Sequence, residues 1–280
     1  MRQVWDGARL TYAVGSVHWE AFLVKPVAVR PGIFDDRALS GQKLGGVHLT
    51  SSPRIIRPLA FDAFYYWNVS PQVNLFAAKG RETTRTLGAR ARGRIGQFDF
   101  SLGGIGQWGE FGVKHVRAFS AHADAGWTFR GQLEPHLQLR ADVLSGGTRR
   151  DGTITTFNAL YPNVAYSTEA TIEAPANLVQ VGIVGRIDPA RAVTLQYTLE
   201  GLWRYSAQDA FYAAPLTPLV RPNSINDRFS GVEQQLSVTY RLNSYLTFSA
   251  AAVHFSVGNF IRSAGGRDEN FGMAAMALRL

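Results

Sequence analysis

The sequence predicts an all-β protein, an antiparallel transmembrane β-barrel of which about thirteen strands are present in the 280 residues. Three observations lead to this prediction. Apolar and polar residues alternate with a period of two, while helical spacing is hard to find. Short and long connections follow one another between the predicted strands, and aromatic residues collect near both strand ends.

The composition excludes several classes of protein. Charged residues make up 18% of the chain, below the roughly 25% of typical soluble domains. No cysteine is present, which excludes disulfide scaffolds, thiolate metal sites and cysteine nucleophiles. No run of about 18 apolar residues occurs, so no transmembrane helix is expected. The histidines lack metal-ligand spacing, and we expect neither a metal nor a cofactor.

The alternation defines the strands. In residues 193–200, Val, Leu, Tyr and Leu alternate with Thr, Gln, Thr and Glu, and residues 235–242 and 119–129 follow the same pattern. Successive strand side chains point to opposite faces, so each segment has one apolar and one polar face. In chain order the predicted strands are 8–14, 17–27, 46–51, 59–67, 82–92, 97–108, 115–129, 136–144, 178–187, 192–204, 231–242, 245–255 and 270–280.

The connections join these strands into hairpins with two different ends. The short ones are 15–16, 52–58, 93–96, 130–135, 188–191 and 243–244. The long ones are 28–45, 68–81, 109–114, 145–177, 205–230 and 256–269. Tight turns at one end and long loops at the other are typical of outer-membrane barrels. A soluble sandwich has no reason to place every long loop at the same end.

Aromatic residues support the barrel. Rings with an apolar body and a polar edge gather at both membrane interfaces; the alternative is that aromatics simply favour strands. The residues beside long loops are Trp67, Trp108 and Trp203, and those beside short turns are Trp127, Phe129, Tyr240 and Tyr245. Periodicity alone does not separate a barrel from a sandwich, in which the polar face would meet water outside.

Several segments resemble the bacterial alginate-export family of outer-membrane proteins, and together they cover nearly the whole chain. They are Arg30–Asp36, Trp5–Leu10, Phe157–Pro162, Ala174–Leu178, Arg221–Pro222, Gly231–Glu233 and His254–Ile261. The resemblance implies an eighteen-stranded monomeric barrel in the outer membrane, in contact with its lipid. It also implies passive export of an anionic polysaccharide, alginate-like, and periplasmic export proteins as partners. On this interpretation residues 1–280 are a single barrel domain that lacks its N-terminal strands.

A barrel directs its polar faces into a wet lumen. Arginine is always charged and pairs with carboxylates, and rings of arginine select anions in pores. We therefore expect a substrate-conducting lumen lined by Arg90, Arg92, Arg140, Arg186, Arg204, Arg241, Asp124, Asp142 and Glu200. The alternative is that these charges pair across strands and stiffen the barrel. Arg90 and Arg92, with no acid beside them in their own strand, are the best functional candidates.

Three other functions remain as alternatives. The first is a general anion-preferring porin or an oligosaccharide uptake channel. The second is an outer-membrane lipid hydrolase built from His254 and Ser256 with Asp268 or Asn270, although no nucleophile elbow is present. We expect no catalytic residues. Nucleic-acid binding, suggested by the net charge of +8, is disfavoured because the basic residues are scattered.

The longest loop has its own open question. Residues 145–177 are too many for an idle connector. They either fold into the pore and gate it, as the family resemblance would imply, or form a packed cover at the surface.

Overall fold

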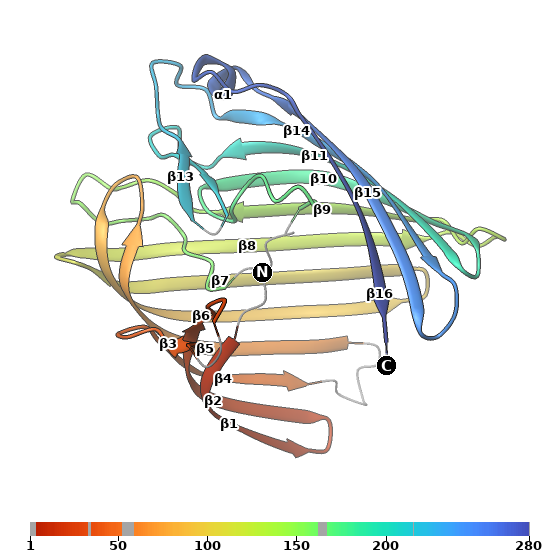
Figure 1. The fold of residues 1–280 in the computed structure, drawn as a ribbon, viewed down its shortest axis with the longest axis horizontal. Coiled ribbons are helices and arrows are strands. Elements are labelled where there is room, and N and C mark those ends of the chain that lie inside the picture. Colours follow the sequence, from red (N-terminus) through yellow and green to blue (C-terminus); the bar gives the residue numbers. More distant parts are fainter. Residues whose placement is uncertain (1–3, 33–34, 52–58, 162–166, 215, 280) are drawn as a thin grey trace.

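Thirteen strands cross a single antiparallel sheet in the computed structural model, in the order in which they occur in the chain (Figure 1). They are β1 (Val4–Val14), β2 (Val17–Ala28), β4 (Lys43–Ser51), β5 (Leu59–Asn74), β6 (Lys79–Ile95), β7 (Phe98–Phe111), β8 (Lys114–Thr128), β9 (His136–Leu144), β10 (Leu178–Ala190), β11 (Val193–Arg204), β14 (Phe229–Arg241), β15 (Leu246–Val257) and β16 (Glu269–Leu278). The structure describes residues 4–32, 35–51, 59–161, 167–214 and 216–279.

Four small elements lie outside this series. β3 (Arg37–Ala38) pairs with β2 and makes the sheet fourteen-stranded, while β12 (Phe211–Ala213) and β13 (Thr217–Val220) form a separate two-stranded ribbon. The helix α1 (Asn259–Ser263) follows β15. No helix in the described part of the chain is long and apolar enough to cross a membrane.

The all-β class and the thirteen predicted strands are confirmed, but several strands are longer than expected. The predicted long connections 68–81 and 109–114 are wrong, because they shrink to residues 75–78 and to Gly112 and Val113. Glycines at 106 and 109 carry no side chain to mark a face, so the alternation fades before β7 ends. The predicted short connection 52–58 lies outside the described residues.

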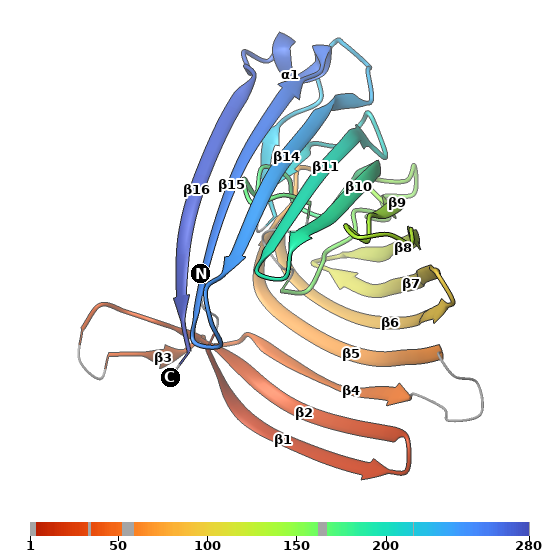
Figure 2. The ribbon, with the colours of Figure 1, turned by 90° about the vertical axis from the view of Figure 1, so that its right-hand side faces the viewer.

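The sheet curves into a wall that surrounds an interior on part of its circumference (Figure 2). We call the side within the curve the inner face and the opposite side the outer face. β1 and β16 form its two edges, and no pairing joins them among the described residues. Closure and the count of eighteen strands therefore stay predictions.

Burial on the two faces is the reverse of that in a soluble sandwich. Large apolar side chains on the outer face are exposed, among them Leu87, Leu102, Leu139, Val181 and Leu236. Polar side chains on the inner face are buried, among them Glu82, Gln107, Gln180, Glu200 and Glu233. Exposed leucines face outward without a partner in the fold, which is the arrangement that a lipid environment stabilises.

A hydrophobic cluster lies inside the curve, near the ends of the strands that lead into the long loops. Ile154 and Phe157 of the 145–177 loop pack there with inner-face residues of the sheet such as Val116 and Leu178. The segment between β11 and β14 adds Tyr212. The long loops thus supply the apolar side chains that cover the inner face at the long-loop end of the sheet.

Aromatic side chains mark both ends of the outer face, as predicted. Trp203 pairs with Phe229 at the long-loop end, with ring centroids 5.7 Å apart. At the short-turn end Trp127 lies opposite Phe98. From Phe98 to Trp108 on β7 the strand rises about 33 Å, which a tilt of about 40° shortens to about 25 Å, the height of the apolar band in outer-membrane barrels.

Candidate functional site

The strand register places all nine predicted lumen residues on the inner face. Arg92 and Asp124 lie in one cross-strand row, because both are paired through Ser101, and Asp124 is paired with Arg140. The remaining members share the same alternation: Arg90, Asp142, Arg186, Glu200, Arg204 and Arg241. Their placement follows from the pairing, whereas their role in conduction stays a prediction.

The first group centres on Asp62 of β5. Arg90 donates from Nε and Nη2 to Asp62 Oδ2 at 3.0 and 2.8 Å, and Thr50 donates to Oδ1 at 3.0 Å. Arg92 Nε lies 3.8 Å from the same carboxylate. Arg90 and Arg92 still expose nearly half of their side chains, 46% and 49%, so both remain within reach of a passing anion.

A second group joins the three strands β8, β9 and β11. His122 contacts Asp142 at 2.7 Å through Nδ1 and Asp124 at 3.1 Å through Nε2. Arg140 bridges Asp124 at 3.5 Å and Glu200 at 3.3 Å. Its side chain is only 24% exposed, so this arginine is less accessible than Arg90. The contacts are those of charges that pair across strands.

Two further arginines lie toward the short turns. Arg186 pairs with Asp188 at 2.9 Å, and Thr194 donates to the other oxygen of that carboxylate at 2.7 Å. Arg241 is exposed and forms no ion pair among the described residues. Both are accessible from the short-turn mouth.

Arg204 differs from the other predicted lumen residues because it is fully buried. Its guanidinium lies 3.4 Å from the centroid of the Phe260 ring. It donates to the carbonyl oxygens of Ala207 at 2.8 Å and Asp209 at 3.0 Å, and also to that of Asp227. These contacts hold the 205–228 segment and α1 together, so the side chain does not line an open passage.

The loop 145–177 folds against the inner face. The Asn158 side chain donates to Glu82 of β6 at 2.6 Å. The Asn158 main chain pairs with the side-chain amide of Gln107 on β7: Gln107 Nε2 donates to the Asn158 carbonyl oxygen at 2.7 Å, and the Asn158 N–H donates to Gln107 Oε1 at 3.0 Å. Ile154 forms main-chain hydrogen bonds with His115 and Arg117 of β8, each 2.9 Å long. The loop therefore lies inside the curve, and residues 162–166 of it are outside the described part of the chain.

The same loop reaches both sides of the interior. Tyr161 accepts a hydrogen bond from Gln42, 2.9 Å long, and its ring lies 4.4 Å from that of Trp5 on β1. Thr168 donates to Glu233 of β14 at 2.6 Å, and the Glu169 amide donates to Gln235 at 2.8 Å. We call residues 145–177 the inner loop.

Glu173 lies at the buried end of the inner loop. Burial raises the pKa of this carboxyl above its ordinary value, against the opposing effect of a hydrogen bond from Ser167. It also interacts electrostatically with Glu200 and Glu233 of the sheet. The end of the loop is therefore packed against like charges.

Five polar residues that hold the inner loop were not predicted as site residues. They are Glu82, Gln107, Gln180, Glu233 and Gln235. Each occupies a polar-face position of its strand, so alternation alone could have placed them on the inner face. What alternation does not indicate is their partner, because the loop contacts are far away in sequence.

The outer face carries a polar set near the long-loop end. His254 Nε2 lies 2.9 Å from Ser256 Oγ, and His254 Nδ1 lies 2.8 Å from Asn270 Oδ1. Asp268 is not part of this set, since it accepts hydrogen bonds from the Val257 amide and Arg262. The structure thus brings together three of the four residues of the hydrolase alternative.

Metal binding finds no support in the described ranges, where no group of three or more His, Asp or Glu side chains could hold an ion.

The comparisons with known proteins give one family. The family model described as Alginate export matches residues 1–275. No curated protein matches the chain. Among solved structures, one described as "NanC porin structure in rhombohedral crystal form" has a TM-score of 0.37 at 9% identity, with 99% of each chain covered.

Proposed function

Because the chain belongs to the alginate export family, we propose that it is an outer-membrane channel through which an anionic, alginate-like polysaccharide leaves the periplasm without chemical change. Residues 1–280 would act as one barrel domain. The observation that carries the proposal is the reversed burial of the sheet, with apolar side chains exposed outside and charged ones inside. Lipid tolerates no open strand edges, so the proposal requires that the edges at β1 and β16 become paired.

The inner charges suggest how a polyanion would pass. Asp62 is buried, but Arg90 exposes 46% of its side chain, so a sugar carboxylate can approach the guanidinium group without displacing Asp62. Arg90 and Arg92 project from alternate residues of β6 and offer two successive contacts. Each contact stays weak because Asp62 neutralises part of the charge of the two arginines. Fast exchange of this kind favours transit over retention.

The inner loop is proposed as the gate of this channel. It crosses the interior from contacts with Trp5 to contacts with Gln235. Its attachments combine single hydrogen bonds with the small hydrophobic cluster around Ile154 and Phe157. A segment held in this way can leave the sheet without unfolding the strands.

The test is conductance of the refolded protein in planar bilayers. We expect anion-preferring current that soluble uronate oligomers block, while neutral oligosaccharides of equal length leave it unchanged. Current that neither oligomer affects would favour the general porin. Block by neutral sugars at the same concentration would favour an oligosaccharide uptake channel.

A second candidate function, acyl hydrolysis, is favoured only by the contacts of His254 with Ser256 and Asn270. The set has the arrangement of a nucleophile, a base and an orienting amide. Ser256 Oγ would attack an ester carbonyl, and His254 would take the hydroxyl proton and give it to the leaving alcohol. A fluorophosphonate probe should label the protein and spare Ser256→Ala; absence of labelling in the unmodified protein removes this candidate.

A further inference from the structure

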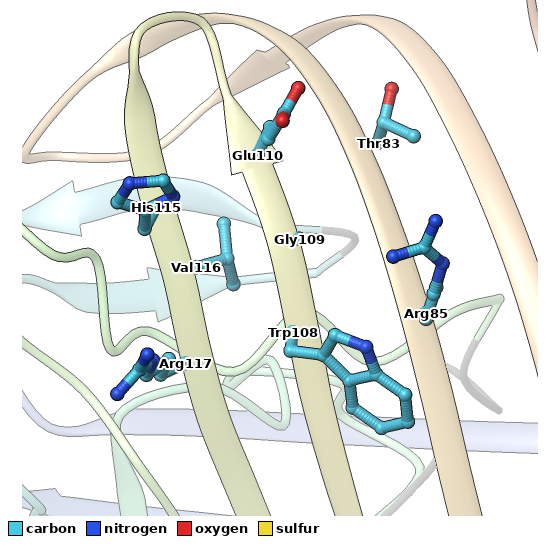
Figure 3. Close-up of a pocket in the computed structure, with 8 residues that line it drawn as sticks. All are labelled: Thr83, Arg85, Trp108, Gly109, Glu110, His115, Val116 and Arg117. Atoms are coloured by element: carbon cyan, nitrogen blue, oxygen red, sulfur yellow. The ribbon is translucent and has the colours of Figure 1, made fainter.

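A row of alternating indole and guanidinium groups crosses the outer face of four neighbouring strands. Trp67 of β5 is paired with Arg85 of β6, Arg85 with Trp108 of β7, and Trp108 with Arg117 of β8. Figure 3 shows Arg85 and Arg117 on either side of Trp108. The row lies close to the ends of these strands that lead into the 75–78 and 112–113 connections.

The row borders a groove of about 360 Å³. On the loop side the next row consists of Thr83, Glu110 and His115, which also line the groove (Figure 3). On the other side the neighbouring row contains Leu87 and Phe119, both exposed on the outer face. The two arginines therefore mark the boundary between the apolar wall and the polar strand ends.

Arg85 and Arg117 also differ from the inner-face arginines in their partners. Both are exposed, and neither forms an ion pair or a side-chain hydrogen bond among the described residues. Arg90, Arg140 and Arg186 each contact a carboxylate within 3.5 Å. A cation beside hydrocarbon is costly unless it reaches the interface or binds an anion. Among the described residues no carboxylate contacts either outer arginine, so both are available to an external anion.

The position of the row identifies the leaflet. Short turns of outer-membrane barrels lie on the periplasmic side and long loops outside. The row is at the long-loop end, about 25 Å above the Phe98 and Trp127 row in the direction of the barrel axis. In the orientation that the proposed function requires, it therefore lies at the headgroup level of the external leaflet.

We propose that Arg85 and Arg117 bind the phosphate groups of a phosphorylated glycolipid in the outer leaflet, with Trp108 packed beneath the bound headgroup. Arginine binds phosphate bidentately. The two Cα atoms are two strand spacings apart, about 10 Å, so both side chains reach a headgroup that covers Trp108. His115 and Thr83 supply further donors at the loop side of the groove. The apolar row with Leu87 and Phe119 contacts the acyl chains of the same lipid.

Glu110 is the one acid among the groove-lining residues. It lies in the row above Trp108 and repels a phosphate. This carboxylate gives the proposal an internal test, because its removal should strengthen binding while removal of the arginines weakens it.

The experiment measures lipid binding by native mass spectrometry in detergent, with bis-phosphorylated lipid A as the probe. We expect Arg85→Ala with Arg117→Ala to weaken binding at least tenfold and Glu110→Gln to strengthen it. The control is Arg130→Ala with Arg191→Ala, which removes two exposed charges at the short-turn end. Circular dichroism confirms that each variant is folded. Equal binding by the arginine variant and the control overturns the proposal.

Two further comparisons identify the source of the phosphate and separate this proposal from the channel. Dephosphorylated lipid A should bind no better to the unmodified protein than to the arginine variant. Phosphatidylglycerol binding as tight as that of lipid A would overturn the assignment to the outer-leaflet glycolipid. Conductance is recorded on the same samples. Lipid A binding tests only the outer face of the sheet. A protein that does not conduct but still binds lipid A through Arg85 and Arg117 therefore refutes the proposed channel and leaves the lipid site intact.

Discussion

The charge around Asp62 can be varied in single steps without altering the strand that carries it. Asp62, Arg90 and Arg92 form one contact group on the inner face with a formal charge of +1. Asp62→Asn raises it to +2, Arg90→Ala lowers it to zero, and Arg90→Ala with Arg92→Ala lowers it to −1. Asparagine at position 62 keeps an oxygen to accept the Thr50 hydroxyl. If this group meets the substrate, anion preference must follow the same order.

The size of each step follows from the geometry. An anion about 5 Å from the group gains roughly 0.8 kcal/mol per unit charge in water, which is about fourfold in local concentration. A Debye length of about 8 Å at physiological salt reduces this to roughly twofold. Because cations are depleted by the same factor, the anion-to-cation permeability ratio should change about fourfold per step and about 60-fold over the series of three steps at physiological salt. At tenfold lower salt the span should widen, because screening weakens.

Reversal potentials under a salt gradient across a planar bilayer measure this ratio. The matched control is Lys25→Ala, which removes one charge from the outer face of β2. We expect the control to leave selectivity unchanged and the four inner-face proteins to fall in charge order. Equal reversal potentials for all four, or an order that ignores the charge, would refute the assignment of Asp62, Arg90 and Arg92 to a conducting lumen.

Three further predictions concern the inner loop and its supports. Glu173→Gln should reduce a pH response. Burial raises the pKa of Glu173, so docking of the inner loop is strongest below the ordinary pKa and weakens as pH rises through the raised value. Open probability should therefore rise less steeply with pH in the variant than in the unmodified channel. Asn158→Ala leaves the buried Glu82 without its amide donor, a loss of about 1–3 kcal/mol, and should raise open probability at least fivefold in single-channel records. Arg204→Met removes three charge-assisted hydrogen bonds, worth about 1.5–3 kcal/mol each. The variant should unfold at a lower urea concentration, while the ion selectivity of the channel stays unchanged. A change in ion selectivity would place Arg204 in the lumen.

The strands were predictable because alternation is a local property. In each of the thirteen central strands, residues two positions apart lie on the same face and have similar polarity, as in Val193–Arg204. The prediction failed where a strand continued through glycine, as at Gly109. A side chain there would meet the Thr83 carbonyl oxygen of β6 at 2.1 Å, so close strand approach explains both the glycine and the lost signal.

The sequence predicts which side chains lie on the inner face, but not which residues these side chains contact. Alternation placed Arg90 and Arg204 on the same side of the sheet, yet one is half exposed and the other fully buried. The difference arises from segments far away in the chain, since α1 and the 205–228 segment cover Arg204. Likewise, Arg90 has no acidic neighbour in its own strand. Its partner Asp62 lies on β5, and only the β5–β6 register reveals this contact.

The burial of the two faces favours a barrel wall over a sandwich, which alternation alone does not separate. In a sandwich the inner face would pack against a second sheet, and the half-exposed Arg90, Arg92 and Arg186 would be buried there, at several kcal/mol for each charge left without full compensation. The outer face would at the same time present large apolar or aromatic side chains to water on every strand from β6 to β11. Both costs vanish in one orientation, with water inside the curve and hydrocarbon outside it.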